Sequence, residues 1–225
     1  MISVACLICL VSFGQISEKT APARAPFTTA TYDHEFEDEI EAFEAQDQQS
    51  PPAPGGIVFS GSSSIRLWDV PRYFPGSDIL NRGFGGSTIA DLLYFENRAL
   101  LNYKPRLVVF YSGENDIVFG RSADDVFSDF KTLYADLTKV VPNVRLVVIG
   151  LKPSPGRQES WPAFRAWNAS VAAFLKDKPN TTFVDLYDRF LGPNGEAQTQ
   201  YFQDEMHLND AGYQIWVDAI RPYVH

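Results

Sequence analysis

Leu107–Tyr111, with the sequence LVVFY, is a short run of β-branched and aromatic residues that leads directly into Ser112–Asp116, the polar and glycine-containing SGEND. A run of this length and composition predicts a strand buried on both faces of a sheet. The same succession occurs twice earlier, where IVF at 57–59 and IL at 79–80 lead into similar turns. Such turns follow the carboxyl ends of strands in α/β proteins.

Two further runs complete the predicted sheet. Val144–Gly150 and Thr182–Leu186 also read as strands, and stretches with helical periodicity separate the runs. The predicted helices cover Thr88–Leu101, Ala123–Val140, Ala163–Leu175 and a last segment from the N-cap Asn209 to near Tyr223. Five strands alternating with helices predict one α/β domain, residues 55–225, whose parallel sheet is covered on both faces and joined by right-handed crossovers.

The composition is that of an ordinary globular domain. The 225 residues are 45% hydrophobic and 21% charged, which excludes a collagen, a coiled coil and a multi-pass membrane protein. The formal net charge is -9, and eight carboxylates without any Lys or Arg lie between Asp33 and Asp47. The acidity therefore belongs mostly to one segment, and nothing indicates a nucleic-acid partner.

The N-terminus resembles a secretory signal peptide. Ile2–Phe13 is an apolar run too short to span a membrane, and small residues at its end predict cleavage after Gly14, although no Lys or Arg precedes the run. Residues 1–14 are therefore predicted to direct a secreted or periplasmic protein without a membrane span in its mature form. Cys6 and Cys9 would be removed with this segment, so no disulfide is expected.

Two segments connect this signal to the domain. Residues 15–32 are small, Pro-containing and aperiodic, as in a linker. Within 33–54, Phe36, Ile40 and Phe43 form one stripe of an otherwise acidic helix, and the Pro-rich SPPAPGG follows. Such a helix either binds a basic partner or packs its stripe on the domain. The second explanation is favoured, because a run of charge is usually a solvated face.

One histidine is a candidate general base. His34 lies in the acidic segment and His225 is the last residue, so only His207 lies within the body of the domain. An imidazole is suited to proton transfer near neutral pH. Asp204, three residues earlier, can share a face with it and orient the ring through a hydrogen bond. A solvated Asp–His pair ahead of a helix is the alternative explanation.

The turns after the strands offer a nucleophile and donors for an oxyanion. The triplet Ser62–Ser64 follows the first strand, and a base could activate one of its hydroxyls, although such a triplet also suits a helix N-cap. Gly85 and Gly86 can offer backbone N–H groups and Asn115 an amide, but these residues are also common in ordinary turns. HExxH and P-loop motifs are absent, and the two cysteines, Cys6 and Cys9, lie in the apolar N-terminal run, so neither a metal nor a cofactor is expected.

These turns resemble the sequence blocks of the SGNH hydrolases, also called GDSL-type esterases and lipases. FSGSSSIRLW at 59–68 resembles the first block and NRGFGGST at 81–88 the second. SGEND at 112–116 resembles the third block and DEMHLNDAGY at 204–213 the last. The resemblance implies a flavodoxin-like, three-layer α/β/α sandwich with a five-stranded parallel sheet.

By position, the resemblance also implies catalytic roles. Ser63 corresponds to the nucleophile, His207 to the general base and Asp204 to the residue that orients the base. The N–H of Gly86, the amide of Asn115 and the N–H of Ser63 itself correspond to the oxyanion hole.

One position departs from the family pattern. The first block usually has Asp directly before the nucleophile, where this chain has Ser62. A GSSS-containing subgroup resembles this chain, so the change does not imply loss of activity, but Ser62 and Ser64 stay open as alternative nucleophiles. The resemblance implies a serine esterase that needs no cofactor and forms an acyl-enzyme on Ser63.

The resemblance implies a small-molecule ester as the substrate, and several kinds remain open. Short-chain acyl esters or O-acetyl carbohydrate esters rank first, ahead of lysophospholipids or other lipids. An O-acyltransferase with the same residues and a catalytically inactive binding module are further alternatives. Trp161 is the best candidate for a substrate wall, whereas Trp68 and Trp167 are expected in the core. The oligomeric state is not indicated.

Overall fold

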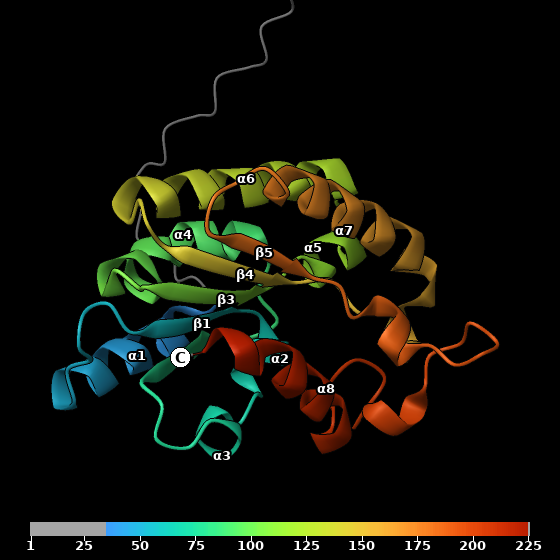
Figure 1. Cartoon of the computed structure of the whole chain (residues 1–225), viewed down its shortest axis with the longest axis horizontal. Coiled ribbons are helices and arrows are strands. Elements are labelled where there is room, and N and C mark those ends of the chain that lie inside the picture. Colours follow the sequence, from blue (N-terminus) through green and yellow to red (C-terminus); the bar gives the residue numbers. More distant parts are fainter. Residues whose placement is uncertain (1–34, 225) are drawn as a thin grey trace, which may run out of the picture. The chain divides into compact units, whose positions relative to one another are not determined.

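The predicted strand at Leu107–Tyr111 forms strand β3, with those bounds, at the centre of a parallel sheet (Figure 1). The computed structural model describes residues 35–224. In this part of the chain the sheet has five parallel strands in the order β2-β1-β3-β4-β5. The other strands are β1 (Ile57–Gly61), β2 (Ile79–Gly83), β4 (Arg145–Ile149) and β5 (Thr181–Val184). The predicted five-stranded parallel sheet is confirmed.

Strands β1 and β2 extend beyond their predicted ends at Phe59 and Leu80. The ladder continues because Gly61 pairs with Gly83 on one side and with Tyr111 on the other. Parallel pairing uses backbone groups alone, so the strands continue after the apolar side chains stop.

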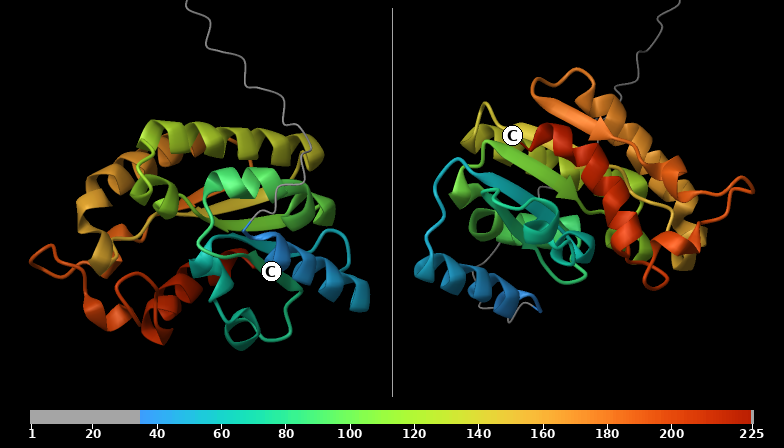
Figure 2. Two further views of the ribbon diagram at one scale, coloured as in Figure 1. Left: turned by 180° about the vertical axis from the view of Figure 1, so that it is seen from behind. Right: turned by 60° about the horizontal axis from the view of Figure 1, so that its bottom comes forward.

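Helices cover both faces of the sheet (Figures 1 and 2). One layer contains α4 (Ile89–Ala99), α6 (Ala123–Val140) and α7 (Trp161–Leu175). The other contains α2 (Ser63–Arg66), α3 (Val70–Tyr73) and α8 (Asp210–Ile220). Helix α5 (Glu114–Val118) follows β3, and 3₁₀ segments cover Leu101–Tyr103, Pro155–Ser160, Tyr187–Phe190, Thr199–Tyr201 and Arg221–Tyr223. The expected three-layer α/β/α sandwich is confirmed.

Aromatic side chains fill the space between the sheet and each helical layer. On the α6 side, the ring of Phe130 lies 5.7 Å from that of Phe110 and 5.8 Å from that of Trp167. On the α8 side, the rings of Trp216 and Trp68 are 5.4 Å apart. Trp68 and Trp167 are 2% and 0% exposed, so both belong to the core, as expected.

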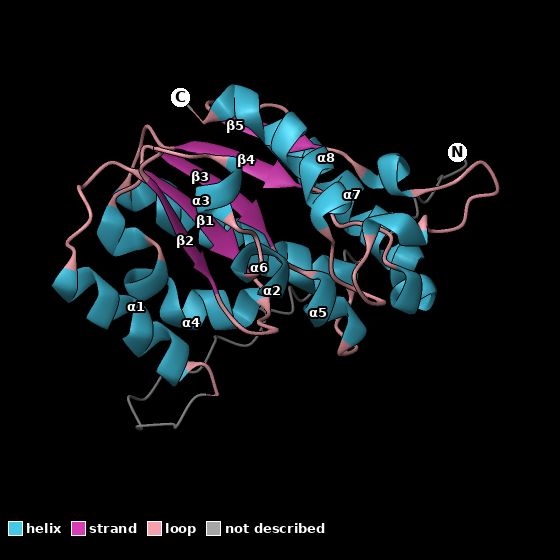
Figure 3. Cartoon of the chain, turned by 90° about the horizontal axis from the view of Figure 1, so that it is seen from below, coloured by secondary structure: helices cyan, strands magenta, loops and turns pink. Residues whose placement is uncertain are grey.

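Helix α1 (Glu37–Gln49) lies beside α4 at the β2 edge of the sheet (Figure 3). Ile40 is fully buried, Phe36 is 8% exposed and Phe43 packs against the core, so the apolar stripe faces the domain as favoured from the sequence. The acidic face is not simply solvated, however. Carboxylates of α1 pair with arginines of the surrounding elements, namely Glu39 with Arg66, Asp47 with Arg82, and both Glu37 and Glu44 with Arg98.

The predictions for the N-terminus fall outside the described residues. They concern the signal peptide at 1–14, the linker at 15–32, Cys6 and Cys9. Between residues 35 and 224, no helix has both the length and the apolar character needed to cross a membrane.

The end of β1 requires a glycine. Gly61 has a φ of +151°, and a Cβ at this position would lie 1.9 Å from the carbonyl oxygen of Tyr111 on the paired strand. Only a residue without a side chain allows the two backbones to approach this closely.

Gly61→Ala is therefore expected to destabilise the protein by at least about 2 kcal/mol, because the added methyl overlaps backbone and the φ is unfavourable. Urea unfolding of the variant and the natural protein measures the difference. Gly56→Ala is the control, since a Cβ there would approach no heavy atom closer than 3.4 Å. Equal unfolding midpoints for the two variants would contradict the expectation.

Candidate active site

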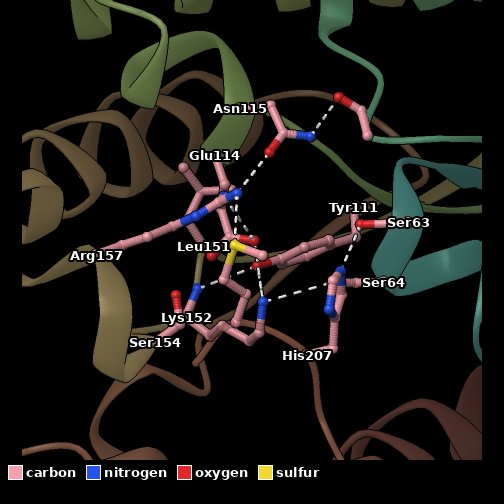
Figure 4. A network of polar contacts seen from close by, with 12 residues as sticks. Ser63, Ser64, Tyr111, Glu114, Asn115, Leu151, Lys152, Ser154, Arg157 and His207 are labelled. Atoms are coloured by element: carbon pink, nitrogen blue, oxygen red, sulfur yellow. Dashed lines mark hydrogen bonds and ion pairs between the residues drawn. The ribbon is translucent and has the colours of Figure 1, made fainter. Parts of the chain in front are cut away.

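Ser63 begins helix α2 directly after β1, and its hydroxyl meets a histidine from the far end of the chain. The Ser63 Oγ lies 3.0 Å from the Nε2 of His207 (Figure 4). Ser64 Oγ instead lies 3.4 Å from the Nζ of Lys152, and Ser62 is only 4% exposed. Of the three candidate serines, only Ser63 makes a hydrogen bond with His207 in this structure, which favours Ser63 as the nucleophile.

Asp204 orients His207 from the same loop. The imidazole Nδ1 lies 2.8 Å from Asp204 Oδ2, and the N–H groups of His207 and Met206 donate to Oδ1 at 2.6 and 2.7 Å. Burial acts to raise the pKa of Asp204, but these N–H groups and the imidazole outweigh it and lower the pKa to about 2. The carboxylate is therefore ionised at neutral pH and can stabilise the imidazolium that forms when His207 takes a proton.

The predicted oxyanion hole needs backbone N–H groups that the fold does not already use. Within residues 35–224, the N–H groups of Ser63 and Gly86 donate no hydrogen bond. The N–H of Gly85, by contrast, donates to Glu39 Oε2 at 3.1 Å. The available donor of the turn is therefore that of Gly86, which favours Gly86 over Gly85 as part of an oxyanion hole.

Asn115 reaches this turn but uses its amide to hold it. The Nδ2 donates to the carbonyl oxygens of Gly86 at 2.7 Å and Ser87 at 3.1 Å. The amide is thus placed next to the Gly86 backbone, as the predicted role requires, while both its protons are engaged. Catalytic hydrogen bonds commonly reach their final geometry only with substrate bound, and the longer bond to Ser87 is the weaker of the two.

Arg157 sets the orientation of this amide, and the sequence did not single it out. Its guanidinium donates to Asn115 Oδ1 at 2.8 Å (Figure 4). It also approaches Met206 Sδ at 3.3 Å. A guanidinium can only donate, so the amide oxygen must face Arg157 and the NH2 group must face the Gly86 turn. The only sequence signal is a basic residue in the Pro-rich loop after β4, which is too common a feature to identify it.

A buried ion pair contacts Ser64, next to the candidate nucleophile, and was also missed. Lys152 is 1% exposed, and its Nζ lies 2.9 Å from Glu114 Oε2 and 3.1 Å from the hydroxyl of Tyr111. Burial lowers the pKa of Lys152, an effect that the neighbouring Glu114 carboxylate opposes. With the contact to Ser64, this pair joins the ends of β3 and β4 to helix α2.

Asp116 anchors the other end of the oxyanion turn, the segment Gly85–Thr88 that leads into α4. It is fully buried, and its two oxygens accept the N–H of Ile89 at 3.2 and 3.0 Å. Burial raises the pKa of Asp116 to about 6. Because Asn115 holds Gly86 and Ser87, two adjacent side chains of α5 position the whole turn that leads into α4.

Two hollows are lined by sequence neighbours of these residues, and neither lining includes Ser63 or His207. One, of about 530 Å³, includes Leu67, one helical turn after Ser63, and Leu208, which follows His207. Its polar lining consists of Asp69, Tyr73, Gln203, Asn209, Asp210 and Tyr213. The other, of about 340 Å³, is lined by Val118 and residues 155–160, which include Arg157.

Trp161, the candidate substrate wall, lines neither hollow. Its indole N–H donates to the carbonyl oxygen of Ser154 at 3.1 Å, and its ring packs edge-on against Tyr187. These contacts fix the indole at the start of α7. In the part of the chain from 35 to 224, no group of three His, Cys, Asp or Glu side chains is placed to hold a metal ion.

The family model described as GDSL-like Lipase/Acylhydrolase family matches residues 67–215 of this chain. The matched segment contains Gly86, Asn115, Asp204 and His207, whereas Ser63 and helix α1 lie before it.

Similar proteins include Platelet-activating factor acetylhydrolase IB subunit alpha1 from Rattus norvegicus, which is 29% identical over 70% of this chain and 69% of its own length. A GDSL-like lipase structure from Bacteroides thetaiotaomicron VPI-5482 has a TM-score of 0.71 at 23% identity, with 82% of this chain and 96% of that chain covered. An acetyl xylan esterase structure has a TM-score of 0.62 at 20% identity, with 75% and 99% covered. These two structures share the fold of this chain.

Ser63→Ala is expected to lower the rate of ester hydrolysis by a factor on the order of 10⁴ or more, because no other serine of the triplet contacts His207. Ser62→Ala and Ser64→Ala are expected to keep a measurable rate. Initial rates on p-nitrophenyl acetate, with circular dichroism as a check of folding, compare the three variants. Full activity of Ser63→Ala would overturn the assignment.

Asn115→Ala is expected to lower kcat roughly 100- to 1000-fold, because it removes an oxyanion donor and the anchor of the Gly86 turn. Asn168→Ala is a matched control. Asn168 is also 5% exposed and its NH2 group also donates to a backbone carbonyl, but that carbonyl and the N–H that its Oδ1 accepts both belong to Leu151. The control should lose stability and keep its kcat. A decrease of less than tenfold in Asn115→Ala would contradict the role.

Proposed function

The chain belongs to the GDSL-like lipase/acylhydrolase family and is an ester hydrolase, and we propose that it cleaves short-chain acyl esters through an acyl-enzyme on Ser63. The observation that carries this proposal is the continuous contact from Ser63 Oγ to His207 Nε2, at 3.0 Å, and from His207 Nδ1 to Asp204, at 2.8 Å. This arrangement supplies a nucleophile, a base and a group that holds the base in the required tautomer.

In the first half of the reaction, Ser63 Oγ attacks the ester carbonyl carbon while its proton passes to His207 Nε2. The carbonyl oxygen becomes an oxyanion, which the N–H groups of Ser63 and Gly86 and the amide of Asn115 would stabilise. His207 then gives its proton to the leaving alkoxide, the bond to the alcohol breaks, and the acyl group stays on Ser63.

In the second half, water attacks the acyl-enzyme and transfers a proton to His207 Nε2. The tetrahedral intermediate collapses, the carboxylic acid leaves, and the proton returns to Ser63 Oγ. The Asp204 carboxylate stays ionised throughout and stabilises the imidazolium in both halves.

The alcohol part of the substrate would lie next to His207, because this residue protonates the leaving oxygen. The hollow that includes Leu208, the residue after His207, is lined by carboxylates, amides and tyrosines together with a few apolar residues. Such groups donate and accept hydrogen bonds with hydroxyls, which suits a carbohydrate alcohol. Export of the protein, which Ile2–Phe13 predicts, would bring it into contact with extracellular carbohydrates.

The acyl part is proposed to be short. The hollow beside Asn115 has Val118 and Pro155 as its apolar side chains, and the rest of its lining is glycine or polar. A small acyl group such as acetyl would leave these polar groups in contact with water. The name of the relative that is 29% identical, an acetylhydrolase, refers to the same acyl group. O-Acetylated carbohydrates are therefore the first candidate substrates.

Exposed apolar side chains favour a lysophospholipid as the second candidate. Phe119 is 70% exposed and Val118 is 40% exposed, and both follow Asn115 within about one helical turn. A long acyl chain could lie over them, since covering apolar side chains that face water lowers the free energy of the complex.

The dependence of the hydrolysis rate on acyl length separates the candidates. With p-nitrophenyl esters from acetate to decanoate and Ser63→Ala as the background, kcat/KM is expected to decrease steeply beyond butyrate. Acetylated oligosaccharides then identify the alcohol. A rate that increases with chain length would overturn the short-acyl proposal in favour of lipids.

A labelling experiment tests the alternatives without hydrolysis. A fluorophosphonate is expected to modify Ser63 in the natural protein, detected by intact mass. Absence of both labelling and hydrolysis would indicate the inactive binding module. Labelling together with faster acyl loss to an added sugar than to water would indicate the acyltransferase.

A further inference from the structure

One carboxylate of helix α1 contacts both parts of the candidate site. Glu39 Oε2 accepts the N–H of Gly85 at 3.1 Å and lies 3.4 Å from the NH1 of Arg66. Gly85 directly precedes Gly86 in the oxyanion turn, and Arg66 lies three residues after Ser63 in α2. A side chain remote in sequence thus links the turn that supplies the oxyanion donor to the helix that supplies the nucleophile.

The start of α1 packs tightly on this turn. Gly85 has a φ of +41°, and a Cβ there would lie 2.1 Å from Phe36 Cε1. The Phe36 ring also meets Phe84 edge-on, with centroids 5.5 Å apart. The turn is therefore enclosed by the aromatic ring on one side while Glu39 holds its N–H.

The rest of α1 is anchored so that Glu39 stays in place. Arg98 of α4 bonds Glu37 at 2.5 Å and Glu44 at 2.6 Å. At the other end of the helix, Asp47 pairs with Arg82, which is 2% exposed, and accepts the hydroxyl of Tyr103 at 2.6 Å. With Ile40 fully buried between these anchors, the helix is held along its whole length.

The turn needs such an external contact because it contains two adjacent glycines. Glycine has the widest range of backbone conformations, so the Gly85–Gly86 pair has little intrinsic preference. The peptide unit that carries the Gly86 N–H follows the Cα of Gly85, and its direction depends on the φ and ψ of Gly85. Holding the Gly85 N–H on a fixed carboxylate restricts this rotation, and a charged acceptor makes the stronger hydrogen bond.

We propose that Glu39 is a positioning residue of the esterase, through which helix α1 aims the Gly86 N–H at the oxyanion formed on Ser63. The proposal rests on the esterase function proposed above. It makes the acidic helix a working part of the active site instead of a docking segment for a basic partner. Asn115 and Asp116 hold the far side of the same turn, so Glu39 completes its support from the other side.

Variants of Glu39 test the inference. Glu39→Ala is expected to lower kcat by a factor on the order of 10 to 100 with little change in KM. Displacing the Gly86 N–H by about an ångström weakens its hydrogen bond to the oxyanion of the transition state, whereas binding of the neutral ester depends little on this donor. Glu39→Gln keeps an acceptor oxygen at the same reach and should recover most of kcat. Glu39→Asp keeps the charge but is one methylene shorter, and should behave like Glu39→Ala.

Glu41→Ala is the matched control, since Glu41 is an exposed carboxylate of the same helix. Thermal unfolding of all variants shows whether α1 stays docked. A kcat of Glu39→Ala within threefold of that of Glu41→Ala would overturn the inference. So would a Glu39→Asp variant as active as the natural protein, because charge alone would then suffice.

A second measurement separates this inference from the proposed function. The second-order rate of Ser63 modification by a fluorophosphonate also depends on the oxyanion donors and needs no ester. The same order of rates, natural protein, Glu39→Gln, then Glu39→Asp and Glu39→Ala, is expected. If no ester is hydrolysed but this order holds, the positioning role stands and the esterase proposal fails. Equal labelling rates in all variants would overturn the positioning role.

Discussion

The pairing of β1 with β3 is the constraint on which the candidate site depends. Gly61 lies opposite Tyr111, and the two backbones approach so closely that only glycine fits there. The N–H of Ser62 then donates to the Tyr111 carbonyl at 3.2 Å, which turns the chain into α2 with Ser63 at its first position. Because parallel strands end at one edge, the residues after β3 arrive beside that serine.

Buried charge supports this edge from beneath. Lys152 and Glu114 form an ion pair that is almost wholly removed from water, and Arg157 lies 3.8 Å from the same carboxylate. Desolvation makes such charges costly unless their partners are well placed, so displacing one of these groups would leave the charges of the others uncompensated. These charges therefore restrict the positions of two neighbours. Lys152 contacts the Ser64 hydroxyl, and Arg157 fixes the orientation of the Asn115 amide. Stiff support of this kind is what an oxyanion site needs, since its donors must be in place before charge develops.

Much of the fold and part of the site follow from local sequence patterns. Apolar runs such as LVVFY predicted the five parallel strands, because burial on both faces requires near-continuous apolar residues. The contact of Asp204 with His207 is local, three residues apart, and a spacing argument could predict it. Choosing Ser63 within its triplet needed the family resemblance at the sequence level, since all three hydroxyls are chemically alike.

Sequence alone determined the strands, their order of alternation with helices, and the four blocks that carry the candidate nucleophile, base and oxyanion donors. Tertiary structure decided which other side chains hold the residues of the candidate site in position. Glu39 meets Gly85 across 46 residues, Arg157 meets Asn115 across 42, and Lys152 meets Ser64 across 88. Periodicity reports only contacts within an element or between its face and the core. A polar side chain that closes a contact between distant loops leaves no periodic signal, so its partner is known only once the chain has folded.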